Sequence, residues 1–240
     1  MNGKENPLTQ GGGILNGSQL KLIALLAMTC DHVGKQLLPQ YELLQIIGRL
    51  AYPVFAYMIA EGCRYTRKKG RYLGNMAVLA FLCQMVYYVA MQSLYQCILV
   101  TFTVSIVLIY SLDAAKRTRS AVSVLLAAAA LLGVYLFSVA LPEALTHTDY
   151  AIDYGIWGIL LPAAVYLAEK KPVKLLAAAV CLFFLGMEYG GIQWYAFLAL
   201  PLLALYDGTV GKRRLKYLFY IYYPLHLACI YLLRRILTEI

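Results

Sequence analysis

The sequence predicts an all-α protein, a polytopic membrane helical bundle of about nine transmembrane helices, with a range of eight to ten. The composition is the first reason: hydrophobic residues make up 62% of the 240 positions, charged residues 14%, and the mean hydropathy is +0.67. Soluble globular chains are far more polar. The apolar runs also approach the roughly 20 residues that a spanning helix needs. They are continuous and rich in Leu and Ala, without the ten-residue alternation of a β-barrel.

The candidate spans follow from the apolar windows, taken in chain order. They cover residues 20–38, 44–63, 73–92, 98–112, 121–141, 152–167, 175–187, 193–206 and 215–233. The fourth, sixth and seventh are short or interrupted, which gives the range of counts. Residues 1–18 are polar and glycine-rich and predict a flexible N-terminal segment, followed by a single transmembrane domain from 19 to 240. No signal peptide pattern precedes the first span, so we expect that span to target the chain.

Lys and Arg alternate between the connections and predict the orientation. Basic residues gather in 64–71, 116–119, 170–174 and 212–216, whereas the connections 39–42, 93–97, 142–149 and 188–191 have neither Lys nor Arg. This pattern predicts a multi-pass protein of the bacterial cytoplasmic (inner) membrane with its N-terminus in the cytoplasm. Arg234 and Arg235 are discordant, because they fall on the outer side. The net charge of +9 is then mostly an orientation signal, and we expect no nucleic acid partner. The six cysteines show no CxxC spacing, so no metal site is expected.

Asp31 and His32 in the first predicted span, and Arg49 in the second, are the main candidate active-site residues. An ionisable side chain inside a membrane costs about 3 kcal/mol or more unless it is paired or lines a wet cavity. Asp31 and Arg49 lie about 10 Å and about 8 Å from the outer ends of their spans, so a helical hairpin brings them together. Lys35 is a rival partner for Asp31 at the i to i+4 spacing. A purely structural ion pair that fixes helix register is the alternative interpretation.

Glu61 and the basic stretch after it are placed at the cytoplasmic end of the second span. Arg64 is the expected partner of Glu61 at spacing i+3, and a solvated salt bridge competes there with a role near a cofactor mouth. Tyr65 and Tyr72 are interleaved with the basic residues in a way that suits an adenine and phosphates. Positive-inside loops have the same composition, so the stretch is not specific.

His226 lies near the middle of the last predicted span, about 15 Å from the cytoplasmic side. Tyrosines surround it, and Pro224 frees a backbone carbonyl one turn earlier, which opens a polar notch in a span. His226 is therefore placed where it can meet the first site. A histidine hydrogen-bonded to a neighbouring tyrosine is the alternative.

These segments resemble the TraX family of membrane proteins, in the order LKLIALLAMTCDHVGK, IGRLAYPVFAYMIAEGCRYTR, RYLGNMAVLAFLCQMVYY and KYLFYIYYPLHLACIYLLRR. That family is named for a conjugation protein that acetylates the N-terminus of pilin, and it resembles the acyltransferase-3 superfamily. The resemblance implies an acetyl-CoA-dependent transmembrane acetyltransferase. Asp31 and His32 match the Asp-His motif, Arg49 the Gly-Arg motif, Glu61 the Glu-Gly motif and His226 the terminal Pro-Leu-His.

The expected reaction is acetyl transfer with acetyl-CoA as the acyl donor. His32 is the expected general base, with Asp31 and Arg49 beside it and His226 as the alternative base. The expected cofactor-binding residues are Glu61, Arg64, Tyr65, Arg67, Lys68 and Arg71.

The acceptor stays open between a peptide amine, a glycan and a lipid-linked sugar. A proton-coupled or anion transporter is the alternative function, because it also needs ionisable groups in the membrane interior. It is disfavoured because the spans show no two-halved symmetry. A passive scaffold leaves the cost of the buried charges unexplained.

Overall fold

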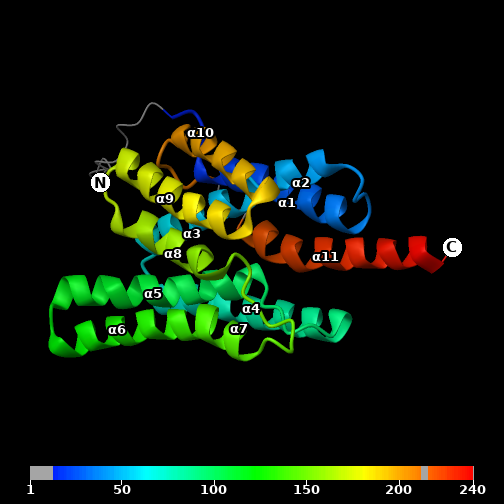
Figure 1. Cartoon of the computed structure of the whole chain (residues 1–240). Coiled ribbons are helices and arrows are strands. Elements are labelled where there is room, and N and C mark those ends of the chain that lie inside the picture. Colours follow the sequence, from blue (N-terminus) through cyan, green and yellow to red (C-terminus); the bar gives the residue numbers. More distant parts are fainter. Residues whose placement is uncertain (1–12, 212–215, 240) are drawn as a thin grey trace. The chain divides into compact units, whose positions relative to one another are not determined.

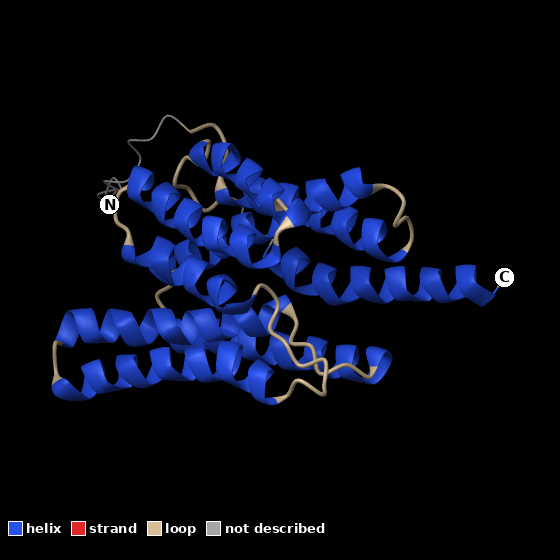
Figure 2. Ribbon diagram, viewed as in Figure 1, coloured by secondary structure: helices blue, strands red, loops and turns tan. Residues whose placement is uncertain are grey.

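The computed structural model describes residues 13–211 and 216–239. Within these ranges the chain is helical, without a strand beyond two isolated bridges (Figure 2). The elements are α1 (Gly17–Gln36), α2 (Glu42–Gly48), α3 (Ala51–Tyr65), α4 (Lys69–Met91), α5 (Ile98–Thr118), α6 (Ala121–Tyr135), the π-helix η1 (Leu136–Ala140), α7 (Leu141–Ala144), α8 (Gly155–Leu167), α9 (Lys171–Tyr189), the 3-10 helix η2 (Gly191–Leu198), α10 (Ala199–Ala204) and α11 (Lys216–Glu239).

The all-α prediction is confirmed, and each of the predicted apolar segments overlaps a helical segment of the described chain. Five helical stretches there are long and apolar enough to cross a membrane: Glu42–Tyr65, Lys69–Val89, Ile98–Thr118, Ala121–Ala144 and Lys171–Tyr189. The helices α1 and α11 are not among these five, and the stretches Gly155–Leu167 and Gly191–Ala204 are shorter. A membrane bundle therefore agrees with the structure, while the number of nine spans stays a prediction.

The chain divides into two compact units, which are described separately. Unit 1 comprises Met1–Phe55 and Tyr189–Ile240, and unit 2 comprises Ala56–Glu188. The single transmembrane domain from 19 to 240 stays a prediction. Of the segment predicted to be flexible, residues 1–12 lie outside the described residues, as do the basic positions 212–215.

The segment before α1 is fastened to the chain that follows α10. The Leu15 N–H donates to the Leu205 carbonyl at 2.9 Å, and the Asp207 N–H donates back to the Leu15 carbonyl at 2.9 Å. Asn16 then caps α1, because its side chain accepts from the N–H groups of Ser18 and Gln19. The Asn16 N–H in turn donates to the Gln19 Oε1 atom, which completes a capping box. The start of α1 is fixed from both sides.

In unit 1, α1 lies against both α2 and α11 (Figure 1). Three contacts set the register of α1 and α11: Thr29 meets Tyr222, His32 meets His226, and Gln36 meets Arg234. Because residue numbers rise together on the two helices, α1 and α11 run parallel. The Arg234 guanidinium donates to the Gln36 amide oxygen at 2.6 Å, so one of the two discordant arginines has a partner at the C-terminal end of α1.

In unit 2, α5 packs against α4, α6 and α8, and Figure 1 shows α5 and α6 side by side. The α5 to α8 contact is close because Gly158 has no side chain: a Cβ atom there would lie 3.2 Å from the Thr101 methyl group. The buried Ser105 hydroxyl donates to the Ile159 carbonyl at 2.9 Å and links the same two helices. These contacts hold the centre of the unit together.

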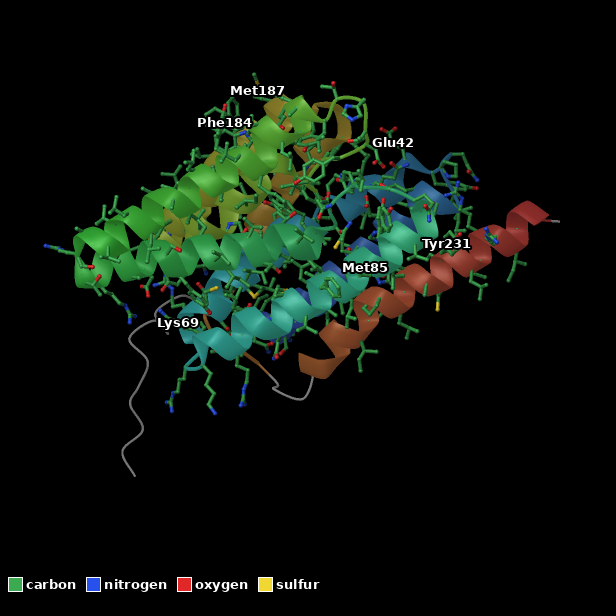
Figure 3. All side chains as sticks on the ribbon, turned by 90° about the horizontal axis from the view of Figure 1, so that it is seen from below. Glu42, Lys69, Met85, Phe184, Met187 and Tyr231 are labelled. Carbon is green, nitrogen blue, oxygen red and sulfur yellow. The ribbon has the colours of Figure 1, made fainter. Side chains whose placement is uncertain are left out.

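Three helices of unit 2, α4, α6 and α9, present apolar side chains outward. Only 11% of the apolar stretch around α6 and 17% of that in α4 is buried, although both are strongly hydrophobic. On α4, Phe81 is 64% exposed, and Figure 3 shows Met85 further along that helix from Lys69. Phe184 and Met187 are likewise exposed on α9 (Figure 3). Exposed apolar surface on this scale is unfavourable in water, so these faces suit contact with lipid.

The two ends of unit 2 differ in charge. At one end, Lys69 and Arg117 both pair with Asp113, at 2.5 Å and 3.3 Å, and Lys116 pairs with Glu169 at 3.3 Å. Three of the basic connections therefore meet at one end, as the orientation pattern requires.

At the other end, the connection before α5 bonds to the connection before α8. The Gln96 N–H donates to the Ala151 carbonyl at 2.8 Å, and the Tyr95 hydroxyl donates to Asp153 at 2.8 Å. The exposed Asp149 carboxylate accepts from the Ser93 hydroxyl and the Leu94 N–H, which lower its pKa below the ordinary value. These connections carry no Lys or Arg.

Candidate active site

Asp31 and Arg49 form a buried ion pair in unit 1, as the sequence predicts. An Arg49 Nη2 hydrogen is donated to the Asp31 Oδ1 atom, and the two residues are only 7% and 8% exposed. The pair forms because α1 and α2 approach closely at two glycines. A Cβ atom at Gly34 would lie 3.0 Å from atoms of Leu44 and Gln45, and one at Gly48 would meet Asp31 itself.

Arg49 lies where the second predicted span is interrupted. Helix α2 ends at Gly48 and α3 begins at Ala51, so Arg49 and Leu50 separate the two. The Arg49 Nε atom donates to the Gln45 carbonyl at 3.3 Å. The predicted single span is therefore two helical segments, and the guanidinium group emerges from their junction.

Asp31 has a second cation beside it. The Lys35 Nζ atom lies 2.7 Å from Asp31 Oδ2, while Arg49 takes Oδ1. The two partners that the sequence offers as rivals are thus both present, one on each carboxylate oxygen. The other side of the Arg49 guanidinium donates from Nη1 to the Gln193 Oε1 atom at 3.1 Å.

His32 and His226 face each other between α1 and α11. Their ring centroids are 5.0 Å apart with the planes at 75°, an edge-to-face arrangement. The Nδ1 atom of His32 lies 2.8 Å from the Met28 carbonyl, and that of His226 lies 2.9 Å from the Tyr222 carbonyl. Because a carbonyl can only accept, Nδ1 carries the proton in both neutral rings and Nε2 keeps its lone pair. Each histidine therefore offers Nε2 as a base.

Aromatic and hydroxyl groups hold this histidine pair. The Tyr222 ring stacks on His226 with centroids 5.2 Å apart, and Tyr223 packs edge-on at 5.5 Å. The Tyr222 hydroxyl shares a 2.6 Å hydrogen bond with the Thr29 hydroxyl of α1. His226 is hydrogen-bonded to a tyrosine, as the alternative interpretation expects, but the acceptor is the Tyr222 backbone carbonyl and not its hydroxyl.

Two buried polar atoms of unit 1 lack a hydrogen-bond partner within the described residues. They are His226 Nε2 and Gln193 Nε2. Buried polar groups are nearly always satisfied, so an unpartnered one calls for an explanation such as catalysis or ligand binding. Both belong to side chains in contact with the predicted site, His226 with His32 and Gln193 with Arg49.

The predicted partner of Glu61 is wrong. Glu61 is 4% exposed, and it pairs with the Lys174 Nζ atom of α9 at 2.5 Å rather than with Arg64. Lys174 is itself 6% exposed and also lies 5.9 Å from the centroid of the Tyr57 ring. The salt bridge is buried in unit 2 and not solvated. The i+3 rule failed because a partner more than a hundred residues away along the chain supplies the better-buried charge.

Arg64 is used differently from the prediction. Its Nη2 atom donates to the Tyr166 and Ala168 carbonyls, at 2.5 Å and 2.8 Å, and so caps the C-terminal end of α8. It also lines an open cavity of about 390 Å³ at the basic end of unit 2, with Asp113, Lys116, Arg117, Tyr166, Leu167 and Glu169. Tyr65 is half-buried, whereas Arg67, Lys68 and Arg71 are exposed. Figure 3 shows nitrogen-tipped side chains extending from the same end of α4 as Lys69.

All six cysteines lie in the described part of the chain as free thiols. Five of the six cysteines are buried or half-buried free thiols, and Cys229 is exposed. No group of three or more metal-ligating side chains gathers in the described part of the chain.

Comparison with known proteins decides the family. The family model described as TraX protein matches residues 16–234, which include every candidate residue above. The chain belongs to the TraX family. A probable fimbrial assembly protein, FimC, of Dichelobacter nodosus is 28% identical to this TraX-family chain, over 88% of the chain and 92% of the relative. An uncharacterized protein of Rickettsia prowazekii (strain Madrid E) is 50% identical over 38 residues, 16% of this chain and 15% of its own. No solved structure matches.

Two contacting residues of this TraX-family chain had no site role predicted from the sequence, Gln193 and Lys174. Lys174 was counted as part of a basic loop, and its burial is visible only once α9 is placed against α3. Gln193 is a single amide at the start of an apolar stretch, which carries no chemical signal alone. Its position two residues after Gly190 and Gly191, on the side predicted to hold Arg49, was the available clue.

Proposed function

We propose that this TraX-family protein is an integral-membrane acetyltransferase that moves an acetyl group from cytoplasmic acetyl-CoA to an acceptor at or across the membrane. The observation that carries the proposal is the arrangement in unit 1: the His32 and His226 rings in contact, next to the buried Asp31 and Arg49 pair. Acyl transfer needs a base and a source of positive charge, and this cluster supplies both.

In the proposed reaction, the acceptor N–H or O–H group attacks the thioester carbonyl carbon. His32 Nε2 takes the acceptor proton as the new C–N or C–O bond forms. The C–S bond then breaks, the acetyl group stays on the acceptor, and the CoA sulfur leaves and gains a proton. Arg49 stabilises negative charge that develops on the carbonyl oxygen, while Asp31 holds Arg49 in place. His226 is the alternative base, because its Nε2 atom is also unprotonated and unpartnered.

For the donor, we propose that the basic end of unit 2 binds the CoA phosphates. The cavity there has three cationic side chains, Arg64, Lys116 and Arg117, against two carboxylates, Asp113 and Glu169. Arg67, Lys68 and Arg71 are exposed beside it in the chain and are available to phosphates. We place this end at the cytoplasmic side of the inner membrane, with a cytoplasmic N-terminus, because three basic connections meet there.

The acceptor is proposed at the level of class. The name of the Dichelobacter nodosus relative and the pilin activity for which the family is named favour a fimbrial subunit amine as the first to test. A glycan hydroxyl and a lipid-linked sugar are the other two candidate acceptors, since the same base and positive charge can serve acetyl transfer to them.

The test is binding of acetyl-CoA to the purified full-length protein in detergent, followed by comparison of acetylated envelope products from cells with and without the gene. Saturable binding, and an acetylated product that depends on the gene, support the proposal. A protein that does not bind acetyl-CoA would be assigned to transport instead, because a proton-coupled or anion transporter also needs the buried charges.

A further inference from the structure

Gln193 is held in a defined place by local backbone geometry. It lies in η2, which begins directly after α9 through Gly190 and Gly191, both with positive φ angles of 62° and 49°. Residues other than glycine rarely adopt this left-handed conformation, so the two glycines permit the backbone geometry at which η2 begins. The side chain is 5% exposed.

The orientation of the Gln193 amide is fixed by its partner. Arg49 Nη1 lies 3.1 Å from the Gln193 oxygen. A guanidinium group has only donors, so the amide atom facing it must be the acceptor Oε1. The NH₂ group therefore points away from Arg49. The O and N assignment follows from chemistry and not from the placement of indistinguishable atoms.

That NH₂ group has no hydrogen-bond partner in the described part of the chain. Gln193 Nε2 is buried and makes no hydrogen bond within the described residues. Leaving a buried donor unsatisfied costs about 1 to 3 kcal/mol, so its retention calls for a compensating use. Arg49 also polarises the amide through Oε1, and polarisation of this kind strengthens the N–H groups as donors.

The donor belongs to the cluster that carries the proposed chemistry. Contacts run from Gln193 to Arg49 and from Arg49 to Asp31, and His32 follows Asp31 on α1. The cluster thus combines a base with a neutral donor and a cation. When a thioester carbonyl becomes an oxyanion, a hydrogen-bond donor and a cation beside it stabilise the negative charge.

We propose that Gln193 is a catalytic residue whose Nε2–H group donates a hydrogen bond to the acetyl carbonyl oxygen of acetyl-CoA. This inference rests on the proposed acetyltransferase function and adds a residue to it. Besides its own positive charge, Arg49 assists this hydrogen bond by polarising the Gln193 amide. The bond strengthens as the oxygen gains negative charge, and no proton is transferred by the amide.

Two variants separate donation from packing. Gln193→Glu keeps an oxygen acceptor for Arg49 and removes the N–H donor, whereas Gln193→Met removes both. The probes are acetyl-CoA and S-ethyl-CoA, a thioether of similar shape without a carbonyl oxygen, bound to the full-length protein in detergent. Because S-ethyl-CoA senses the added charge of Gln193→Glu but not the lost donor, it is the internal control.

The wild-type protein is expected to bind acetyl-CoA about tenfold more tightly than S-ethyl-CoA, as one hydrogen bond gives. Both variants should lose this preference, and only Gln193→Met should also unfold more easily. With an identified acceptor, the kcat of acetyl transfer is expected to be about 100-fold lower in Gln193→Glu than in the wild type.

The outcomes are distinguishable. Equal preference in wild type and Gln193→Glu overturns the role of Gln193 alone, as does a wild type without any preference. A wild type that binds neither compound overturns the acetyltransferase proposal and this one with it.

Discussion

Gly48 packs directly against Asp31. A Cβ atom added at position 48 would lie 2.7 Å from the Asp31 Oδ1 atom and 2.8 Å from its Cα atom. Real side chains do not tolerate such distances, and one of the two atoms is backbone, so α1 and α2 would have to move apart. The absence of a side chain at Gly48 is therefore what allows the Asp31 and Arg49 pair to form.

Gly48→Ala should consequently disrupt the ion pair. We expect a loss of about 1 to 3 kcal/mol in stability, the usual cost of overpacking, together with loss of transfer activity. Thermal unfolding in detergent and an acetyl-transfer assay measure the two effects. Gly74→Ala on α4 is the matched control, because no atom of the described residues lies within 4 Å of a Cβ atom there. A Gly48→Ala protein as stable and active as Gly74→Ala would contradict the described packing.

Substitutions at His32 and His226 are expected to differ in their effect on acetyl transfer. His32→Ala should leave the protein folded and able to bind acetyl-CoA while abolishing transfer, because the proposed base is lost. His32→Asn is a gentler variant, since its amide N–H can still bond the Met28 carbonyl. His226→Asn is the companion variant on α11. If His32→Ala remains fully active and His226→Asn does not, then the base is His226.

The buried pair of Glu61 and Lys174 should behave as a coupled unit. Lys174→Met leaves the Glu61 carboxylate buried without its cation and should destabilise the protein by about 3 to 5 kcal/mol. The double variant Glu61→Gln with Lys174→Met should be more stable than Lys174→Met alone, because the stranded charge is removed. Unfolding of the two single variants and the double variant gives the coupling. Additive effects would show that the pair does not interact.

Arg64 and Arg71 should separate stability from ligand binding. Arg64→Leu removes two hydrogen bonds from a charged donor to the end of α8 and should cost about 2 kcal/mol or more in stability. Arg71→Leu is exposed and should unfold like wild type while binding acetyl-CoA more weakly, with a reduced dependence on salt. Thermal unfolding and acetyl-CoA titration at two salt concentrations check both. Unchanged affinity in Arg71→Leu would remove this arginine from the phosphate site.

Hydropathy predicted the helices well, because each is built from local apolar runs. Local spacing also predicted the Asp31 partners, since depth along two adjacent helices decides which side chains can meet. The helix break at Arg49 was not predicted, because neither a proline nor a pair of glycines lies at that position. The single Gly48 is equally typical of close packing between two helices. The number of spans is undecided where a predicted segment is short, as in α8, or partly 3-10, as in η2.

Pairs between residues far apart in the chain were harder to predict from the sequence. Glu61 was given the nearest cation in the chain, yet burial favours whichever cation the fold brings alongside, and that is Lys174. The meeting of His32 and His226 was predicted because both were placed deep in their spans. Gln193 had no comparable signal in the sequence. Its amide indicates a role only once the structure shows that Oε1 accepts from Arg49 while the buried Nε2 has no partner among the described residues.

Asp31 is held between Lys35 and Arg49, so these three side chains together carry a net charge of +1. An ammonium group is repelled from such a place and must arrive as the free amine. An α-amino group, with a pKa of about 8, does so far more readily than a lysine side chain, with a pKa of about 10.4. The net positive charge around Asp31 would therefore favour acetylation of the amino group at a chain terminus over acetylation of surface lysines.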